Sequence, residues 1–122
     1  MADKKIVLAI DDNVQQLSEF RNILSAKYDL RVVKSAFEAI SFLNREATDI
    51  ILLDIMMPNI SGFEFLEDIL KIPSYENVPV IIVSGNTSEE FLEKAKNSGA
   101  RGVLIKPVKP DTLIEEIEKN LA

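Results

Sequence analysis

Residues 50–58 read Ile-Ile-Leu-Leu-Asp-Ile-Met-Met-Pro, a run of large apolar side chains that contains one carboxylate. The four apolar residues 50–53 predict a strand buried on both faces, as in a parallel sheet. An ionised Asp54 at the end of such a strand must contact water, a cation or several hydrogen-bond donors. Pro58 then prevents the strand from continuing through a central ladder. We therefore expect Asp54 to lie half exposed at one edge of a sheet.

The composition around this stretch is that of one folded domain. The chain has 122 residues, of which 47% are hydrophobic and 28% are charged, as in soluble globular proteins. Its net charge of -6 argues against non-specific binding to nucleic acid or to anionic membranes. No apolar run approaches the ~18 residues of a membrane span, and five apolar residues after the N-terminal lysines are too few for a signal peptide. We expect a single domain over residues 1–122, located in the cytoplasm.

Two absent residue types restrict the chemistry. Without Cys the chain has no disulfide, thiol nucleophile or zinc-thiolate site. Without His it has no Ser-His-Asp triad, no imidazole metal ligand and no phosphohistidine. Any bound metal must take oxygen ligands, which favours Mg²⁺ or Ca²⁺, with Mn²⁺ as an alternative.

Short apolar runs alternate with amphipathic helical patterns along the whole chain. We predict strands at 6–10, 30–33, 50–54, 80–83 and 103–105. Capping pairs predict where four helices begin, and Pro110 fits the first turn of a fifth; the pairs are Asn13 with Gln16, Ser35 with Glu38, Ser61 with Glu64, and Thr87 with Glu90. Gly99 is expected to end the fourth helix as its C′ residue. The alternation predicts an α/β fold of the (βα)5 type: a five-stranded parallel sheet with helices on both faces, and strand 30–33 at an edge.

Each predicted helix has an apolar face that we expect to pack on the sheet. The inward residues are Val14, Leu17, Phe20, Ile23 and Leu24 in the first helix; Phe37, Ile40 and Leu43 in the second; Leu66, Ile69 and Leu70 in the third; Phe91, Leu92 and Ala95 in the fourth; and Leu113, Ile114, Ile117 and Leu121 in the fifth.

Polar side chains follow the predicted strands at their carboxyl ends, where ligands bind in open α/β sheets. Asp11 and Asp12 follow the first strand, Asp54 ends the third, Ser84 follows the fourth and Lys106 follows the fifth. If the first and third strands are neighbours, roughly 4.8 Å apart, three carboxylates converge. Three carboxylates this close together all stay ionised at neutral pH only if a cation lies among them. A small dication that prefers oxygen ligands fits this requirement.

The same residues form an anion site over that metal. A phosphoryl group held by Mg²⁺, the ammonium of Lys106 and the hydroxyl of Ser84 has its charge matched from three sides, as phosphoryl transfer requires. Asp54 is then the natural nucleophile, and its product is an acyl phosphate.

Each residue taken alone also has a structural interpretation. Asp12 is as well explained as a helix N-cap or first-turn acid, and Asp11 as a solvated loop acid. Asp54 could be a turn or cap residue, Ser84 is part of a good turn sequence, and Lys106 could be a surface charge. A purely structural role for all five residues at once is a poor explanation, because one topology places all five side chains at the same edge of the sheet.

With these residues assembled, the chain resembles the receiver domains of two-component response regulators, of the stand-alone chemotaxis and phosphorelay type. The resemblance covers essentially the whole chain and implies one receiver domain with a doubly wound, flavodoxin-like sheet of strand order 2-1-3-4-5. Its markers are Asp11-Asp12, Asp54 followed by Met57-Pro58 and Gly62, Ser84-Gly85, and Lys106-Pro107.

The resemblance implies a role for each marker. Asp54 would accept phosphate from a histidine kinase or a histidine phosphotransfer protein, since the chain has no His of its own. Asp11, Asp12, Asp54 and the backbone carbonyl of Met56 would bind Mg²⁺. Lys106 would pair with the phosphoryl oxygens, and Ser84 would move inward to bond one of them. The family also implies a cis bond between Lys106 and Pro107.

One position departs from the family pattern. Three residues before the lysine, receivers usually carry Tyr or Phe, whereas this chain has Val103, whose stiff side chain has no ring to turn. Because of this departure we consider two rival functions: a phosphorylation switch, and an interaction module that works without phosphorylation. A magnesium phosphatase or phosphotransferase ranks below both, because Asp54-Ile55-Met56 lacks the second acid of an Asp-x-Asp motif.

We expect a complete single-domain regulator whose protein partner binds the face of the fourth helix, fifth strand and fifth helix.

Overall fold

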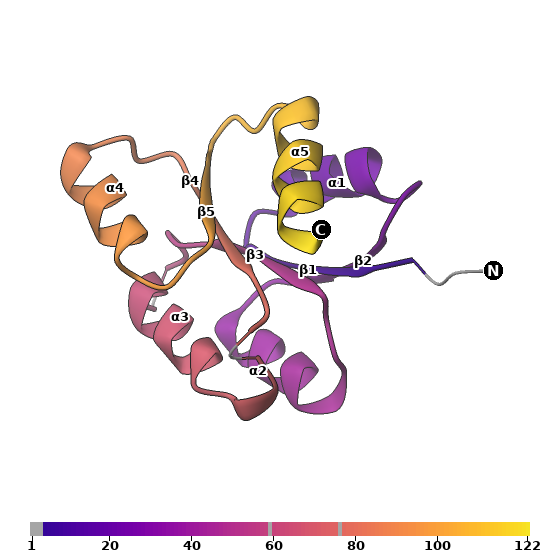
Figure 1. Ribbon diagram of the computed structural model, residues 1–122, viewed down its shortest axis with the longest axis horizontal. Coiled ribbons are helices and arrows are strands. Elements are labelled where there is room, and N and C mark those ends of the chain that lie inside the picture. The colour runs from indigo at the N-terminus through magenta and orange to yellow at the C-terminus, as the bar shows by residue number, and fades with distance from the viewer. Residues whose placement is uncertain (1–3, 59, 76) are drawn as a thin grey trace.

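The computed structural model describes residues 4–58, 60–75 and 77–122. Five parallel strands form one sheet in the order β2-β1-β3-β4-β5, as predicted (Figure 1). The strands are β1 (Ile6–Ile10), β2 (Asp29–Val33), β3 (Ile50–Asp54), β4 (Val80–Ser84) and β5 (Gly102–Ile105). They alternate with α1 (Val14–Leu24), α2 (Ala36–Arg45), α3 (Gly62–Leu70), the short 3-10 helix η1 (Pro73–Tyr75), α4 (Glu89–Lys96) and α5 (Pro110–Leu121). The described part of the chain contains no helix both long and apolar enough to cross a membrane.

The helices cover both faces of the sheet and divide the core in two. In Figure 1, α1 and α5 lie on one side of the sheet, and α2 and α3 lie on the other. Neighbouring strand residues point to opposite faces, so Leu52 packs with the α1 and α5 side and Leu53 packs with the side of α2, α3 and α4. Both side chains are fully buried or nearly so. This burial on both faces is why residues 50–53 carry no polar alternation.

The strand neighbours determine where the polar residues meet. β3 is central, since Ile51 is paired with Leu8 of β1 and also with Val80 of β4. β2 pairs with β1 alone and is an edge strand, as its short and charged sequence predicts. All strands run in one direction, so their carboxyl ends form a single edge of the sheet.

Side-chain caps begin α1 to α4, whereas α5 begins at Pro110 without one, and one predicted cap is off by a residue. Asn13 accepts hydrogen bonds from the backbone N–H groups of Gln15 and Gln16, and Ser35 and Ser61 cap α2 and α3 as predicted. The cap of α4 is Ser88, not Thr87, because the Ser88 hydroxyl accepts from the Phe91 N–H at 3.2 Å while its own backbone is extended. The Ser/Thr-x-x-Glu spacing selected Thr87 because Glu90 stands three residues on, whereas Ser88 has Phe91 at that position.

The end of α4 also lies earlier than predicted. The helix ends at Lys96 with Asn97 as its C-cap, and Gly99 is therefore the second residue past the cap rather than C′. Gly99 does have a positive φ of 97°, a conformation that glycine adopts without strain. A Cβ there would also approach Leu70 to 2.8 Å, so the turn packs closely on α3.

Three residues assigned to inward helix faces are exposed. Phe37 is 84% exposed: α2 buries Ala39, Phe42 and Leu43, and two residues of helix rotate Phe37 to the face opposite Ala39. Val14 lies on the same helix face as Leu17 but is exposed, because it is the first residue of α1, at the carboxyl end of the sheet. Leu92 follows the buried Phe91 and turns outward.

Candidate functional site

Asp54 is the last residue of β3 and is buried. It is 5% exposed, so the expectation of a half-exposed carboxylate is wrong. The reason is its position on the central strand, where β1 and β4 flank it on both sides. Its Oδ1 accepts a hydrogen bond from the Met56 N–H at 3.0 Å, and its Oδ2 lies 3.5 Å from Lys106 Nζ.

Asp11 and Asp12 follow β1, the strand next to β3. Asp11 is 1% exposed and its backbone N–H donates to the Val33 carbonyl, so it is not a solvated loop acid. Its Oδ1 accepts from the Asn13 N–H at 2.9 Å. Asp12 is exposed. One carboxylate oxygen from each of Asp11, Asp12 and Asp54 lies within 4.8 Å of the others, which confirms the predicted convergence.

Lys106 directly follows the edge strand β5 and brings a positive charge to this cluster. Its Nζ lies 3.4 Å from Asp11 Oδ2 and 3.5 Å from Asp54 Oδ2. Its backbone N–H donates to the Ser84 carbonyl at 2.8 Å, which ties the residue after β5 to the end of β4. The bond from Lys106 to Pro107 is cis, as the family resemblance implies.

The cluster has more negative charge than one lysine can balance. The pKa of the Asp11 carboxyl is raised to about 6, mainly by burial and also by the hydrogen bond and charge of Asp54, while the Asn13 N–H and the charge of Lys106 act to lower it. In the absence of another cation, a proton thus competes for this carboxylate near neutral pH. A dication with oxygen ligands would remove that competition, so the donor set fits Mg²⁺.

Ser84 ends β4 beside these groups. It is buried, and its hydroxyl oxygen accepts from the Asn86 N–H at 3.0 Å. Because Asp54 is in register with Val83, Ser84 stands one residue further along the neighbouring strand. The structure therefore brings Ser84 to the same edge, with its hydroxyl oxygen engaged by its own loop.

Two backbone donors that orient the carboxylates are not predicted from the sequence. The N–H groups of Asn13 and Met56 each bond the aspartate two residues before them. The signal for these turns is an Asp whose side chain can reach the backbone two residues on. The side chain of Met56 itself is 63% exposed at the site mouth.

Val103 occupies the position at which the family resemblance leads us to expect an aromatic ring. Its partly buried side chain packs against the core on the side of α2, α3 and α4.

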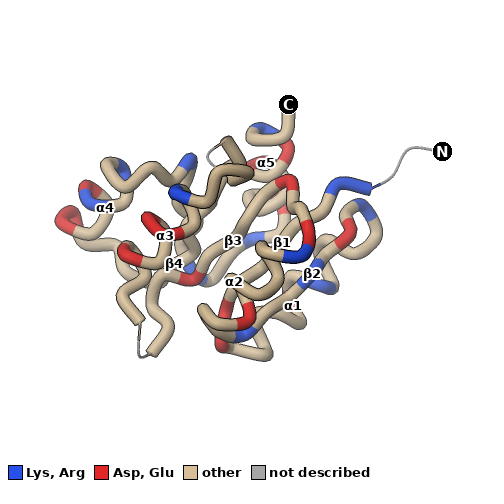
Figure 2. The backbone as a smooth tube through the Cα atoms, turned by 90° about the horizontal axis from the view of Figure 1, so that it is seen from below, with Lys and Arg blue, Asp and Glu red and all other residues tan. Residues whose placement is uncertain are grey.

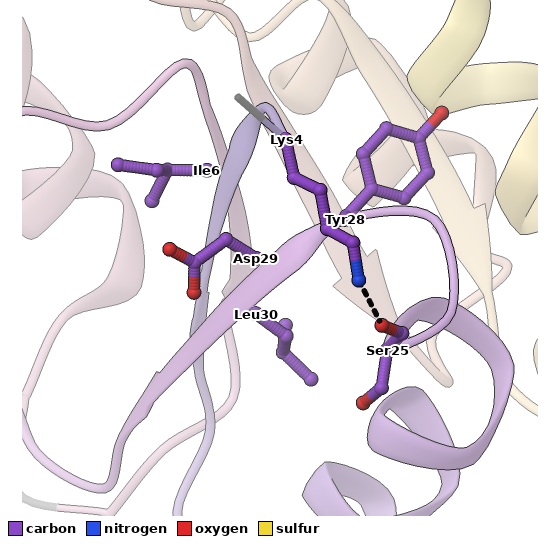
Figure 3. Close-up of a pocket in the computed structure, with 6 residues that line it drawn as sticks. All are labelled: Lys4, Ile6, Ser25, Tyr28, Asp29 and Leu30. Carbon is purple, nitrogen blue, oxygen red and sulfur yellow. Dashed lines mark hydrogen bonds between the residues drawn. The ribbon is translucent and has the colours of Figure 1, made fainter. Parts of the chain in front are cut away.

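A cavity of about 600 Å³ lies away from the carboxylate cluster. Figure 3 shows its walls, among them Lys4, Ser25, Tyr28 and Asp29, with Lys4 Nζ donating to the Ser25 carbonyl. It surrounds the first residues of β1 and β2, at the opposite end of these strands from the carboxylates. Basic and acidic residues also lie interspersed along the chain in Figure 2. The carboxylate cluster with Lys106 is thus the candidate site.

The family model described as "Response regulator receiver domain" matches residues 7–118. The chain belongs to this family. Receiver domains take phosphate from histidine kinases and bind Mg²⁺ at an acidic pocket, and this receiver has the corresponding Asp11, Asp12 and Asp54 cluster. The fold is that of a signalling phosphoacceptor.

Individual relatives agree with this assignment. The receiver is 30% identical over 118 residues to protein PilH of Pseudomonas aeruginosa, covering 95% of this chain and 97% of PilH. It is 31% identical to the hydrogenase transcriptional regulatory protein HoxA of Cupriavidus necator, covering 98% of this chain but about a quarter (25%) of HoxA. Among solved structures, the Vibrio cholerae chemotaxis protein CheY4 is similar, with a TM-score of 0.90, 29% identity and coverage of 97% of this chain and 99% of CheY4.

Proposed function

We propose that Asp54 accepts a phosphoryl group from a phosphohistidine of a histidine kinase or histidine phosphotransfer protein, in a Mg²⁺-dependent reaction that switches the binding of a protein partner. The observation that carries the proposal is the meeting of three carboxylates with one ammonium group: one oxygen from each carboxylate lies within 4.8 Å of the others, and Lys106 Nζ lies within 3.5 Å of the carboxylates of Asp11 and Asp54. Residues 1–122 act as one receiver unit in this proposal, located in the cytoplasm.

Asp11, Asp12, Asp54 and the backbone carbonyl of Met56 would hold the Mg²⁺. The ion, when bound, neutralises charge on the phosphoryl oxygens and lets the acceptor carboxylate and the phosphoryl group approach. Asp12 is the exposed member of the set, so it faces the side from which a hydrated ion enters. The buried Asp11 is held in place by the Asn13 N–H.

The chain's own groups perform the transfer. A carboxylate oxygen of Asp54 attacks phosphorus, an oxygen–phosphorus bond forms, and the bond from phosphorus to the donor's imidazole nitrogen breaks with its electron pair going to that nitrogen. The Met56 N–H orients the Asp54 carboxylate. Lys106 stabilises charge on the phosphoryl oxygens, and the Ser84 hydroxyl turns from its own loop to donate to one of them.

Val103 favours a second candidate, a receiver fold that binds its partner without phosphorylation. Without a ring at this position, the movement of Ser84 lacks the aromatic side chain that would follow it. In either case we place the partner on the face of α4, β5 and α5, and we propose no direct contact with nucleic acid or membrane.

Intact mass separates the candidates. The parent and an Asp54→Asn variant are incubated with acetyl phosphate, each with Mg²⁺ and with EDTA. The switch requires one added phosphoryl group in the parent with Mg²⁺ and none in the other three samples. A folded parent that gains no mass favours the phosphate-independent module. Rapid turnover of other phosphoesters would instead indicate an enzyme.

A stable mimic tests the switch itself. Beryllofluoride with Mg²⁺ should change the backbone amide chemical shifts of Ser84 and α4 in the parent. Shifts confined to residues that touch the bound mimic would show that the site fills but does not switch, in agreement with the module.

A further inference from the structure

Exposed apolar side chains gather around the carboxylate cluster. Among the residues that the structure describes, five large hydrophobic side chains are exposed: Val14, Phe37, Met56, Leu92 and Ile105. All except Leu92 lie at the carboxyl edge of the sheet, either at the end of a strand or shortly after it. Large apolar groups exposed together mark interaction sites more often than groups scattered singly.

Phe37 is the most exposed of them and forms one wall of a groove. The groove, of about 340 Å³, runs between the start of α2 and the segment after β3, and its walls include Asp12, Lys34, Phe37, Met57, Pro58 and Ile60. Apolar side chains make up most of this set. Asp12 is both a wall of the groove and a member of the carboxylate cluster, so the groove opens directly beside the site.

Folding does not explain why Phe37 is a large aromatic residue. The core on this side of the sheet is filled by Ala39, Phe42 and Leu43 of α2. Phe37 points away from them and keeps 84% of its surface exposed. Aromatic residues contribute strongly to binding when a partner covers them.

The position of the groove identifies the partner. Asp54 is 5% exposed, so a phosphohistidine can reach it only if the protein that carries it covers the mouth of the site. A protein seated in the groove contacts Asp12 and would obstruct any other donor. We propose that this groove, with Phe37 as its exposed wall, receives an apolar side chain of the phosphohistidine protein that transfers to Asp54. The inference rests on the proposed function and adds a docking subsite on the α2 side.

The test compares small and protein donors on a Phe37→Ser variant. The protein donors are the purified histidine kinases and histidine phosphotransfer proteins of the source organism, each charged with labelled phosphate from ATP. Leu92→Ser is the matched control, because Leu92 is an exposed apolar helix residue (39%) on α4 and outside the groove. With acetyl phosphate, both variants should be labelled at the parent's rate. With the best protein donor, kcat/KM should fall roughly tenfold for Phe37→Ser, mainly through KM, and stay unchanged for Leu92→Ser.

Several results would overturn the inference. They are equal transfer from the protein donor to Phe37→Ser and the parent, a parallel loss with acetyl phosphate, an equal loss in Leu92→Ser, or a parent that acetyl phosphate labels but no phosphohistidine protein does. Loss of an output protein from Phe37→Ser with unchanged transfer would assign the groove to that other partner. Failure of the proposed function is distinct, since the parent then gains no phosphoryl group even from acetyl phosphate.

Discussion

At the scale of single residues, the Asp11 carboxyl links the site to the stability of the fold. Burial raises its pKa from 3.8 to about 6. Between these values the folded protein binds more protons at Asp11 than the unfolded chain does, so this group makes the free energy of unfolding fall as pH rises. The effect is complete once pH exceeds the folded pKa. Its full size for a shift of about two units is about 3 kcal/mol.

We therefore expect Asp11→Asn to change the pH dependence of stability in metal-free protein. The free energy of unfolding of the parent, minus that of the variant, should decrease from pH 4 to pH 6 and then level off. Urea unfolding in EDTA at several pH values measures it. Asp68→Asn, which removes an exposed carboxylate of α3 outside the cluster, is the control substitution. A parent–variant difference that stays constant with pH would contradict the raised pKa.

Lys106 gives a prediction with two opposite signs. Its Nζ is within 3.5 Å of two buried carboxylates, so Lys106→Met removes positive charge from the metal site and from the phosphoryl site together. Mg²⁺ should bind several-fold more tightly, because one competing cation is gone. Labelling by acetyl phosphate should slow on the order of a hundredfold, because charge on the phosphoryl oxygens loses its partner.

Titration calorimetry and intact mass measure the two effects of Lys106→Met. Lys109→Met, at an exposed lysine three residues further on, is the control and should alter neither. Weaker Mg²⁺ binding in Lys106→Met would indicate that the lysine supports the fold of the site rather than its charge balance.

Residue chemistry was more predictable from the sequence than residue exposure. Acidic residues at strand ends predict a cation site whatever their depth, so Asp11, Asp12 and Asp54 were found together. The burial of Asp54 depends on β1 and β4 lying on either side of its strand, which is a property of the assembled sheet. The hydrogen bonding of the Ser84 hydroxyl depends on the local loop, where the Asn86 N–H donates to it.

At the scale of elements, the cap of α4 can be tested by substitution. Ser88→Ala should lower the free energy of unfolding by about 1 kcal/mol, because the Phe91 N–H loses its acceptor. Thr87→Ala should change it much less, since the structure places Thr87 one residue outside the cap. Urea unfolding of both variants decides between the two adjacent hydroxyls, and a larger loss in Thr87→Ala would return the cap to Thr87.

The strands could be predicted more accurately than the inward faces of the helices. An apolar run such as residues 80–83 indicates a doubly buried strand without further information. A helix face, in contrast, depends on how far the helix extends past the sheet. Val14 fits the helical periodicity yet lies beyond the sheet edge, and Phe37 fits a pattern with Ile40 while Ala39 points inward. The small side chain of Ala39 gave little signal in the sequence.

At the scale of the whole molecule, the sheet both assembles the site and separates two cores. The site residues come from segments as far apart as Asp11 and Lys106, and they meet because the strands are parallel and ordered β2-β1-β3-β4-β5. The same sheet leaves Ile69 of α3 in one core and Ile117 of α5 in the other, both fully buried. Both cores therefore hold the site edge in place without sharing side chains.

This separation predicts additive effects of substitutions in the two cores. Ile69→Val and Ile117→Val each remove one buried methylene and should each lower the free energy of unfolding by about 0.5–1.5 kcal/mol. The double variant should show the sum to within about 0.5 kcal/mol, because the two side chains pack on opposite faces and have no common partner. Urea unfolding of the four proteins gives the coupling energy. A coupling of ~1 kcal/mol or more would mean that the strands transmit packing strain between the faces, and the site edge would then respond to both cores as one unit.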